Sequence, residues 1–326
     1  MKDTNRKIVV MDGYALNPGD LDWSWMEAYG NVTVYDRTGA EEIPSHAEGA
    51  EVIFTNKTPI TRELIAACPE LKMIGVLATG YNVVDCQAAA ERGIPVCNIP
   101  AYATDSVVQM TMALLLEICH QVGHHDRLVH EGEWARRGEF CFWDRPMTEL
   151  TGKTFGIIGF GKIGQKMARV ASAFGMKVIY TSRHRRPEEE QGICSFVSME
   201  ELLGTSDIVS LHCPLFAENE KMINKDTIAR MKDGAILLNT ARGGLVSDED
   251  LAEALNSGKL AGAGLDVVSE EPISDDNPLL QARNCFIAPH IAWAPLETRS
   301  RLMGIAEENL RAFAEGHPIH VVNGVC

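Results

Sequence analysis

Short apolar runs alternate with segments of helical periodicity along the whole chain. In the first third of the sequence the apolar runs cover residues 8–11, 32–35, 52–55, 73–78 and 94–99. Each is four to six residues long, which is the length of a buried strand, and polar segments of helical character separate them. This alternation predicts a parallel sheet whose strands are connected by crossover helices.

A second series of apolar runs follows after a gap. It covers residues 154–158, 177–181, 208–212, 235–239, 261–267 and 285–288. The helices between these runs carry recognisable start signals, since Ser198 stands three residues before Glu201 and Ser247 three residues before Asp250. The sequence therefore predicts an α/β protein with two doubly wound parallel sheets.

The break between the two series predicts a domain boundary and a hinge. Residues 98–102 place a proline after the last run of the first series and before an apolar helix at 107–119. A helix at 296–315 and the tail at 320–322 come after the second sheet is complete, so we expect them to pack on the first domain. The expected domains are residues 1–100 with 292–326, and residues 101–291. A chain of 326 residues exceeds the usual size of a single core, in agreement with two domains.

Composition excludes several classes of partner. The net charge of -15 opposes attraction to nucleic acid and to anionic membranes, which both require clustered Lys and Arg. The longest apolar stretch, 107–119, is interrupted by polar residues and is too short to span a bilayer. Nine cysteines without CxxC pairs or zinc-like spacing indicate reduced thiols, no metal site and a cytoplasmic location.

A glycine-rich turn lies between the first strand and the first helix of the second series. Gly159, Gly161 and Gly164 have GxGxxG spacing directly after the run 154–158 and before a helix predicted at 165–174. In this context the glycines permit a tight turn, close approach of a pyrophosphate and close helix packing, with the helix N-terminus facing the negative charge. The segment predicts a dinucleotide-binding Rossmann domain.

The residues after the next strand bear on the choice of dinucleotide. An acidic residue is expected there if the adenosine ribose has a free 2'-hydroxyl, but the strand ends in Ser182. Arg183, Arg185 and Arg186 follow it in an otherwise acidic chain. We therefore expect NADP(H) to be preferred over NAD(H), because arginine makes charge-assisted hydrogen bonds to a 2'-phosphate. The alternative is a solvated basic loop without function, in which case NAD would serve.

Charged residues follow three strands of the second sheet, where ligands bind in open α/β folds. Arg242 comes soon after the run 235–239, Asp266 closes the run 261–267, and His290 follows 285–288, with Glu271 in the loop after Asp266. Hydride delivered to a carbonyl carbon leaves charge on oxygen, which a protonated histidine neutralises while an arginine holds the substrate. We expect Glu271 to orient His290. The pattern predicts reversible reduction of a carbonyl group.

These motifs resemble the D-isomer-specific 2-hydroxyacid dehydrogenases. The resemblance rests on residues 159–164, 239–243, 264–267, 271–272 and 289–291 and covers nearly the whole chain. It implies that Arg242 binds substrate, that Glu271 and His290 form the acid–base pair, and that Asp266 lies at the nicotinamide end. It further implies a flavodoxin-like substrate domain whose loop offers backbone N–H groups to the substrate carboxylate, and an active site in the cleft between domains. The residues expected in that loop are Ala78, Thr79 and Gly80. The cofactor contacts expected in addition to the three glycines and Asp266 are Thr104, Lys162, Ile163, Ser182, Arg183, Arg185, Cys213, Pro214, Thr240 and Ala241.

Within the family, residues 100–106, 140–143 and 289–293 look most like bacterial glycerate dehydrogenases, also called hydroxypyruvate reductases. The expected reaction converts hydroxypyruvate or glyoxylate to D-glycerate or glycolate. Two alternatives stay open. One is a reductase of bulkier 2-keto acids, which depends on Tyr81, Tyr102, Trp143 and Trp293 around the pocket. The other is a nucleotide-sensing scaffold without catalysis, as in the transcriptional corepressors that share this fold.

An aromatic segment at 131–150 stands outside the regular alternation. It carries Trp134, Phe140, Phe142 and Trp143, which is more apolar surface than a free loop exposes. We expect a dimer arm, since family members are typically homodimers joined through the nucleotide domain. Packing within one subunit is the alternative.

Overall fold

The computed structural model describes residues 5–325, so residues 1–4 and Cys326 of the expected first domain lie outside the described residues. The chain divides into two compact units. Unit 1 comprises Met1–Tyr102 with Ala294–Cys326, and unit 2 comprises Ala103–Trp293. Unit 2 is therefore inserted into the sequence of unit 1, whose two segments are far apart along the chain.

Unit 1 is built on a five-stranded sheet in the order β2-β1-β3-β4-β5, with every pair parallel. The strands are β1 (Lys7–Val10), β2 (Asn31–Val34), β3 (Val52–Thr55), β4 (Met73–Val76) and β5 (Val96–Cys97). Every residue of β3 and β4 is buried, which explains why both appear as continuous apolar runs in the sequence. The helices are α1 (Ile43–Ala47), α2 (Arg62–Ala67), α3 (Cys86–Glu91) and α12 (Leu296–Ala314), with short 3₁₀ turns at Gly13–Ala15 and Ser24–Ala28.

The C-terminal segment completes unit 1. Helix α12 contacts β4, and the tail behind it reaches the edge strand β5. There Val321 forms an antiparallel bridge to Cys97, and the Val322 N–H donates to the Val96 carbonyl at 2.9 Å. Val321 and Val322 thus lie along the edge of a sheet that the first hundred residues build.

Unit 2 contains a seven-stranded sheet in the order β12-β11-β10-β9-β6-β7-β8, and again every pair is parallel. Its strands are β6 (Thr154–Ile158), β7 (Lys177–Thr181), β8 (Cys194–Phe196), β9 (Ile208–Leu211), β10 (Ala235–Asn239), β11 (Leu260–Leu265) and β12 (Cys285–Ile287). Its helices are α4 (Thr104–His120), α5 (Val122–His130), α6 (Glu133–Arg137), α7 (Lys162–Ala173), α8 (Pro187–Glu190), α9 (Met199–Thr205), α10 (Lys225–Arg230) and α11 (Asp248–Ser257), and short 3₁₀ turns lie at Ala217–Asn219, Gly243–Leu245 and Pro278–Gln281. The two parallel sheets confirm the predicted α/β class.

Local signals account for most of these elements. The Ser198 hydroxyl accepts a hydrogen bond from the Glu201 N–H at 3.1 Å at the start of α9, and Ser247 does the same for Asp250 at 3.4 Å at the start of α11. Strand β8 was not predicted, because two of its three residues are exposed and it has no apolar run. Strand β4 ends at Val76, two residues earlier than predicted, so residues 77–80 form a loop after it.

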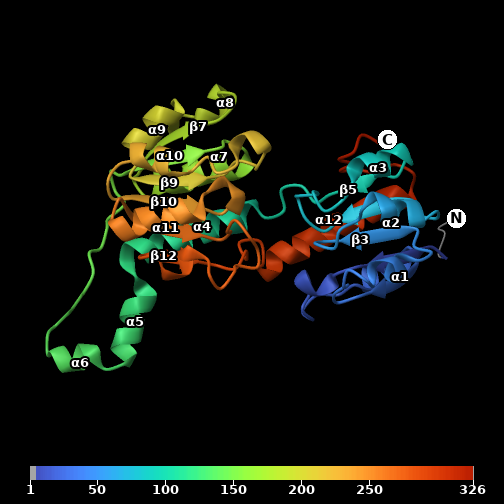
Figure 1. The fold of residues 1–326 in the computed structure, drawn as a ribbon, viewed down its shortest axis with the longest axis horizontal. Helices are drawn as coiled ribbons and strands as arrows, with labels where there is room; N and C mark the ends of the chain where they lie inside the picture. The colour runs from blue at the N-terminus through green and yellow to red at the C-terminus, as the bar shows by residue number, and fades with distance from the viewer. Residues whose placement is uncertain (1–4, 326) are drawn as a thin grey trace. The chain divides into compact units, whose positions relative to one another are not determined.

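Residues 121–149, which we call the arm, project from the body of unit 2 (Figure 1). Helices α5 and α6 contain no buried side chain, and the chain returns to the body in an extended segment. The exposed fraction is 90% for Phe140 and 62% for Trp143, so packing within one subunit does not account for these aromatic residues. No helix among residues 5–325 is long and apolar enough to cross a membrane.

Candidate active site

The glycine turn after β6 has the geometry that close approach requires. Gly159 has a φ of +98°, and a Cβ added there would lie 2.6 Å from the Cys213 nitrogen. A Cβ at Gly164 would lie 2.2 Å from the Gly159 carbonyl oxygen, whereas one at Gly161 would meet open space. Two glycines therefore allow backbone to pack on backbone, and Gly161 leaves room at the N-terminus of α7, where Lys162 and Ile163 begin the helix. These residues fit the pyrophosphate of a dinucleotide.

The arginines after β7 have different environments. Arg185 forms a paired contact with Glu190, with Nε and Nη2 at 2.8 and 3.0 Å from its carboxylate oxygens. The guanidinium of Arg183 lies over the Phe216 ring at 4.9 Å, and no carboxylate of residues 5–325 pairs with it. Ser182 donates to the His184 carbonyl at 2.6 Å. Arg183 and Arg186 thus carry charges that no carboxylate of residues 5–325 pairs with. The Glu190 partner of Arg185 was not foreseen because no pattern in the sequence marks it.

The other expected cofactor residues begin or follow elements of unit 2. Thr104 is the first residue of α4, and Cys213 and Pro214 follow β9. Beyond β10, the Thr240 hydroxyl is 2.8 Å from that of Thr111, and the Ala241 N–H donates to the Asn239 side chain at 3.0 Å. These contacts fix the backbone at the carboxyl edge of the sheet.

The sequence reasoning missed His212, which precedes Cys213. Its Nε2 lies 2.8 Å from the Ser210 hydroxyl, and burial lowers the pKa of His212 to about 4. A Cβ at Gly159 would also lie 2.6 Å from the His212 carbonyl oxygen, so this residue forms the floor beneath the glycine turn. In the sequence, the only signal for His212 is its position at the end of an apolar run, where strand-end residues can lie near a ligand.

The acid–base pair predicted from the sequence comes together. His290 follows β12, and its Nδ1 lies 2.6 Å from the Glu271 Oε2 atom. The side chains of His290 and Glu271 are 31% and 34% exposed, so solvent or a ligand can reach them. Because Nδ1 donates to the carboxylate, Nε2 is the atom that can exchange a proton with a substrate oxygen. His290 also has a φ of +55°, in the left-handed region that few residues other than glycine adopt.

Asp266 holds the backbone that follows His290. One carboxylate oxygen accepts the Ile291 N–H at 2.8 Å and the other accepts the Ala292 N–H at 2.9 Å. The residue is 1% exposed, and burial raises the pKa of Asp266 above its usual value against the effect of these two hydrogen bonds. Its expected place at the nicotinamide end stays a prediction. Its two hydrogen bonds fix the backbone of residues 291–292.

Arg242 lies next to the loop that carries Glu271. A Cβ on the following residue, Gly243, would lie 1.7 Å from the Val268 carbonyl oxygen, so the turn after β10 packs backbone to backbone against the loop after β11. The Arg242 guanidinium donates to its neighbour Ala241 at 2.6 Å. Among residues 5–325 it has no carboxylate partner, which leaves its charge available to an anionic substrate.

The loop Ala78–Gly80 of unit 1 has three backbone N–H groups without a partner among the described residues. The carbonyl oxygens of the three preceding peptide groups are all hydrogen-bonded: Leu77 to the Asn56 side chain at 2.8 Å, Ala78 to the Ile99 N–H at 3.0 Å, and Thr79 to the Asn98 side chain at 2.8 Å. In a trans peptide the N–H points opposite to the C=O. The N–H groups of residues 78, 79 and 80 therefore point away from these partners, and none donates to another group in the described chain. Such unpartnered N–H groups are available to an anionic ligand.

Comparison with known proteins agrees with this geometry. The family model described as "D-isomer specific 2-hydroxyacid dehydrogenase, NAD binding domain" matches residues 112–292. A hydroxypyruvate reductase from Blautia hydrogenotrophica is 57% identical over 97% of this chain and 99% of its own length. A glycerate dehydrogenase from Methylorubrum extorquens is 36% identical with the same two coverages. A solved structure described as an acyclic imino acid reductase (Bsp5) in complex with NADPH and D-Arg is 29% identical, has a TM-score of 0.84 and covers 97% of this chain and 99% of that one.

The fold and the site thus define a nicotinamide-dependent oxidoreductase. The chain belongs to the D-isomer specific 2-hydroxyacid dehydrogenase family. This confirms the family predicted from the motifs and the prediction of a dehydrogenase.

Proposed function

We propose that this enzyme reduces hydroxypyruvate to D-glycerate and glyoxylate to glycolate, with NADPH as the preferred cofactor. The observation that carries the proposal is the 2.6 Å contact between His290 and Glu271 beyond the end of β12. The substrate is suggested by the similarity to a hydroxypyruvate reductase and a glycerate dehydrogenase over 97% of the chain. In this reading unit 2 is the dinucleotide-binding domain and unit 1 is the substrate domain.

Each group of the chain has a part in this reaction. The reduced nicotinamide supplies the hydride when bound, and Gly159, Gly161 and Gly164 with the start of α7 hold its pyrophosphate. Arg242 attracts the keto acid and stabilises the charge that develops on its carbonyl oxygen. His290 delivers a proton from Nε2 to that oxygen, while Glu271 keeps the imidazole in place through Nδ1. The loop Ala78–Gly80 binds the substrate carboxylate.

The preference for NADPH rests on the loop after β7. No carboxylate follows the end of β7 directly, and Arg183 has an unmatched charge where a 2'-phosphate is expected. Arg185 contributes less, because Glu190 already neutralises its charge. Thr104, Ser182, Cys213, Pro214, Thr240 and Ala241 are proposed to line the rest of the cofactor site.

One assay tests substrate and cofactor together. Oxidation of NADPH and of NADH is followed with hydroxypyruvate, glyoxylate, pyruvate and a branched 2-keto acid. We expect the highest kcat/KM for hydroxypyruvate with NADPH. Highest kcat/KM with the branched acid would favour a reductase of bulkier substrates, equal or better use of NADH would discard the cofactor preference, and no turnover of any 2-keto acid would leave the nucleotide-sensing scaffold.

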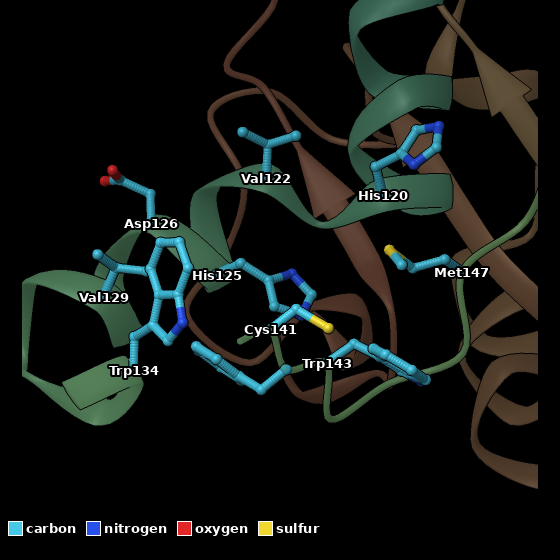
Figure 2. A pocket seen from close by; sticks show the side chains of 10 residues that line it. His120, Val122, His125, Asp126, Val129, Trp134, Cys141, Trp143 and Met147 are labelled. Carbon is cyan, nitrogen blue, oxygen red and sulfur yellow. The ribbon is translucent and has the colours of Figure 1, made fainter. Parts of the chain in front are cut away.

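We also propose that the enzyme is a homodimer joined through the arm. The arm and the end of α4 form a hollow of about 510 Å³ (Figure 2). Most of its lining is apolar or aromatic, including Val129, Trp134, Trp143 and Met147, and His120, His125 and Asp126 also line it. The extended part is tied to α5 by a contact of 2.9 Å between His124 and Asp144, so the hollow is a formed surface. A second copy is the expected occupant because exposed apolar surface of this kind is characteristic of subunit interfaces.

A cytoplasmic location is the last part of the proposal. Eight cysteines between residues 5 and 325 have free thiols, and several of them are buried, as expected of a protein kept in a reducing compartment.

A further inference from the structure

The support of the loop Ala78–Gly80 extends to the C-terminal segment of the chain. Asn98, just after β5, donates from its side chain to the Thr79 carbonyl at 2.8 Å. The backbone of Asn98 is in turn held at both ends: its N–H donates to the His320 carbonyl at 3.1 Å, and its carbonyl accepts from the Asn309 side chain at 2.9 Å. Asn309 and His320 therefore hold the backbone of Asn98, whose side-chain amide binds the loop.

Asn309 and His320 also contact each other. The Asn309 Oδ1 atom accepts a hydrogen bond from the His320 Nδ1 atom at 2.8 Å, which leaves the Asn309 amide nitrogen to donate to Asn98. Asn309 is 1% exposed in α12, so its side-chain hydrogen bonds are made within the protein. His320 has a φ of +54°, which shows that the tail is held in a defined conformation at this point. All these residues belong to unit 1.

We propose that Asn309 and His320 are positioning residues for the binding of the substrate carboxylate. They act through Asn98 on the Thr79 carbonyl, and the direction of that carbonyl sets the direction of the Gly80 N–H in the same peptide group. If Asn98 shifts, the peptide is free to rotate, and one of the three N–H donors no longer faces the carboxylate. The proposal rests on the proposed function of the loop and assigns no contact with substrate to Asn309 or His320.

The discriminating variant is Asn309→Asp. It keeps the shape of the side chain but replaces the amide donor with an oxygen that faces the Asn98 carbonyl. We expect the KM for hydroxypyruvate to rise about tenfold, as for the loss of one carboxylate hydrogen bond. We expect kcat and the KM for NADPH to stay within about twofold, because the groups that move the proton and hold the nucleotide are unchanged. The inhibition constant of oxalate, a dicarboxylate that is not reduced, should rise in parallel with the KM for hydroxypyruvate.

The matched control is Asn17→Asp. Asn17 is also a buried asparagine of unit 1 whose side chain donates to a carbonyl, that of Leu21 at 2.6 Å, but it has no contact with the loop. It should lower the melting temperature about as much as Asn309→Asp and leave the KM for hydroxypyruvate unchanged. An unchanged KM in folded Asn309→Asp, or equal rises in both variants, would overturn the proposal and leave a purely structural role.

A second pair of variants decides the question if Asn309→Asp does not fold. His320→Gln keeps a side-chain donor for Asn309, whereas His320→Leu removes it. The KM for hydroxypyruvate should therefore rise in His320→Leu and stay closer to the wild-type value in His320→Gln. Equal KM values for hydroxypyruvate in these two variants would contradict the proposal. The test is separate from that of the proposed function, because a wild-type enzyme that reduces no 2-keto acid refutes the function, whereas an active wild type with unaffected variants refutes only this inference.

Discussion

At the scale of single residues, the contact between His290 and Glu271 makes the sharpest prediction. His290→Ala should abolish turnover of every 2-keto acid and leave NADPH affinity nearly intact, since the imidazole serves proton transfer. Glu271→Gln keeps a hydrogen-bond acceptor but removes the charge, and should lower kcat/KM about 100-fold. Steady-state kinetics and fluorescence titration of NADPH measure both quantities. Retained turnover with weakened NADPH binding would show that His290 contributes to cofactor binding and not to proton transfer.

The two arginines of the loop after β7 provide a matched comparison. Arg183→Ala should lower kcat/KM for NADPH ten- to a hundredfold, which corresponds to a charge-assisted hydrogen bond of about 1.5–3 kcal/mol. It should leave kcat/KM for NADH within about twofold. Arg185→Ala is the control, because Glu190 already neutralises that charge and the loss for NADPH should be smaller. The opposite order of the two losses would show that Glu190 releases Arg185 when the nucleotide binds.

At the scale of elements, Asp266 joins the end of β11 to the segment behind β12. Asp266→Asn removes one of the two acceptors that hold the N–H groups of Ile291 and Ala292. The backbone next to His290 should loosen, and kcat should fall about tenfold while the KM for hydroxypyruvate changes little. Kinetics at saturating NADPH measure this effect. A selective rise in the KM for NADPH would instead support a direct contact of Asp266 with the nicotinamide.

The end of β9 makes the stability of unit 2 depend on pH. Burial lowers the pKa of His212 to about 4, so the folded state keeps this histidine neutral while the unfolded chain takes up a proton near pH 6.5. The unfolded state binds more protons between these two values. The contribution of His212 to the free energy of unfolding is therefore fully present above about pH 6.5 and is lost as the pH falls toward 4. The loss amounts to about 3 kcal/mol. Urea unfolding at a series of pH values gives the free energy of unfolding at each pH. This free energy should change less steeply with pH in His212→Asn than in the wild type, and equal slopes would assign the acid sensitivity to other groups.

The elements also show how far the sequence could predict this molecule. All eleven apolar runs expected in the two series overlap strands, and Ser198 and Ser247 marked helix starts, because burial and capping leave local patterns. The positions of Arg242, Glu271 and His290 followed from the rule that ligands bind at the carboxyl ends of strands. Strand β8 has no apolar run, and the pairing of Arg185 with Glu190 or of Asn309 with His320 leaves no periodic signal. Contacts of that kind depend on tertiary structure alone.

At the scale of the whole molecule, the arm predicts a concentration-dependent dimer. Val129→Glu combined with Trp143→Glu places two charges on the apolar hollow and should convert a species of twice the chain mass into one of single mass at micromolar concentration. Sedimentation equilibrium measures this mass. Phe196→Glu is the control, since it changes an exposed aromatic residue of unit 2 outside the arm. A wild-type protein of single mass at micromolar concentration would contradict the proposed dimer.

The insertion of unit 2 into unit 1 has a consequence for synthesis on the ribosome. Domains generally fold in the order in which they emerge, from the N-terminus onward. Here the first hundred residues must wait for α12 and for the strand-like tail at Val321 and Val322, which are translated after all of unit 2. The nascent chain can therefore complete unit 2 before unit 1, although the first hundred residues of unit 1 leave the ribosome earlier.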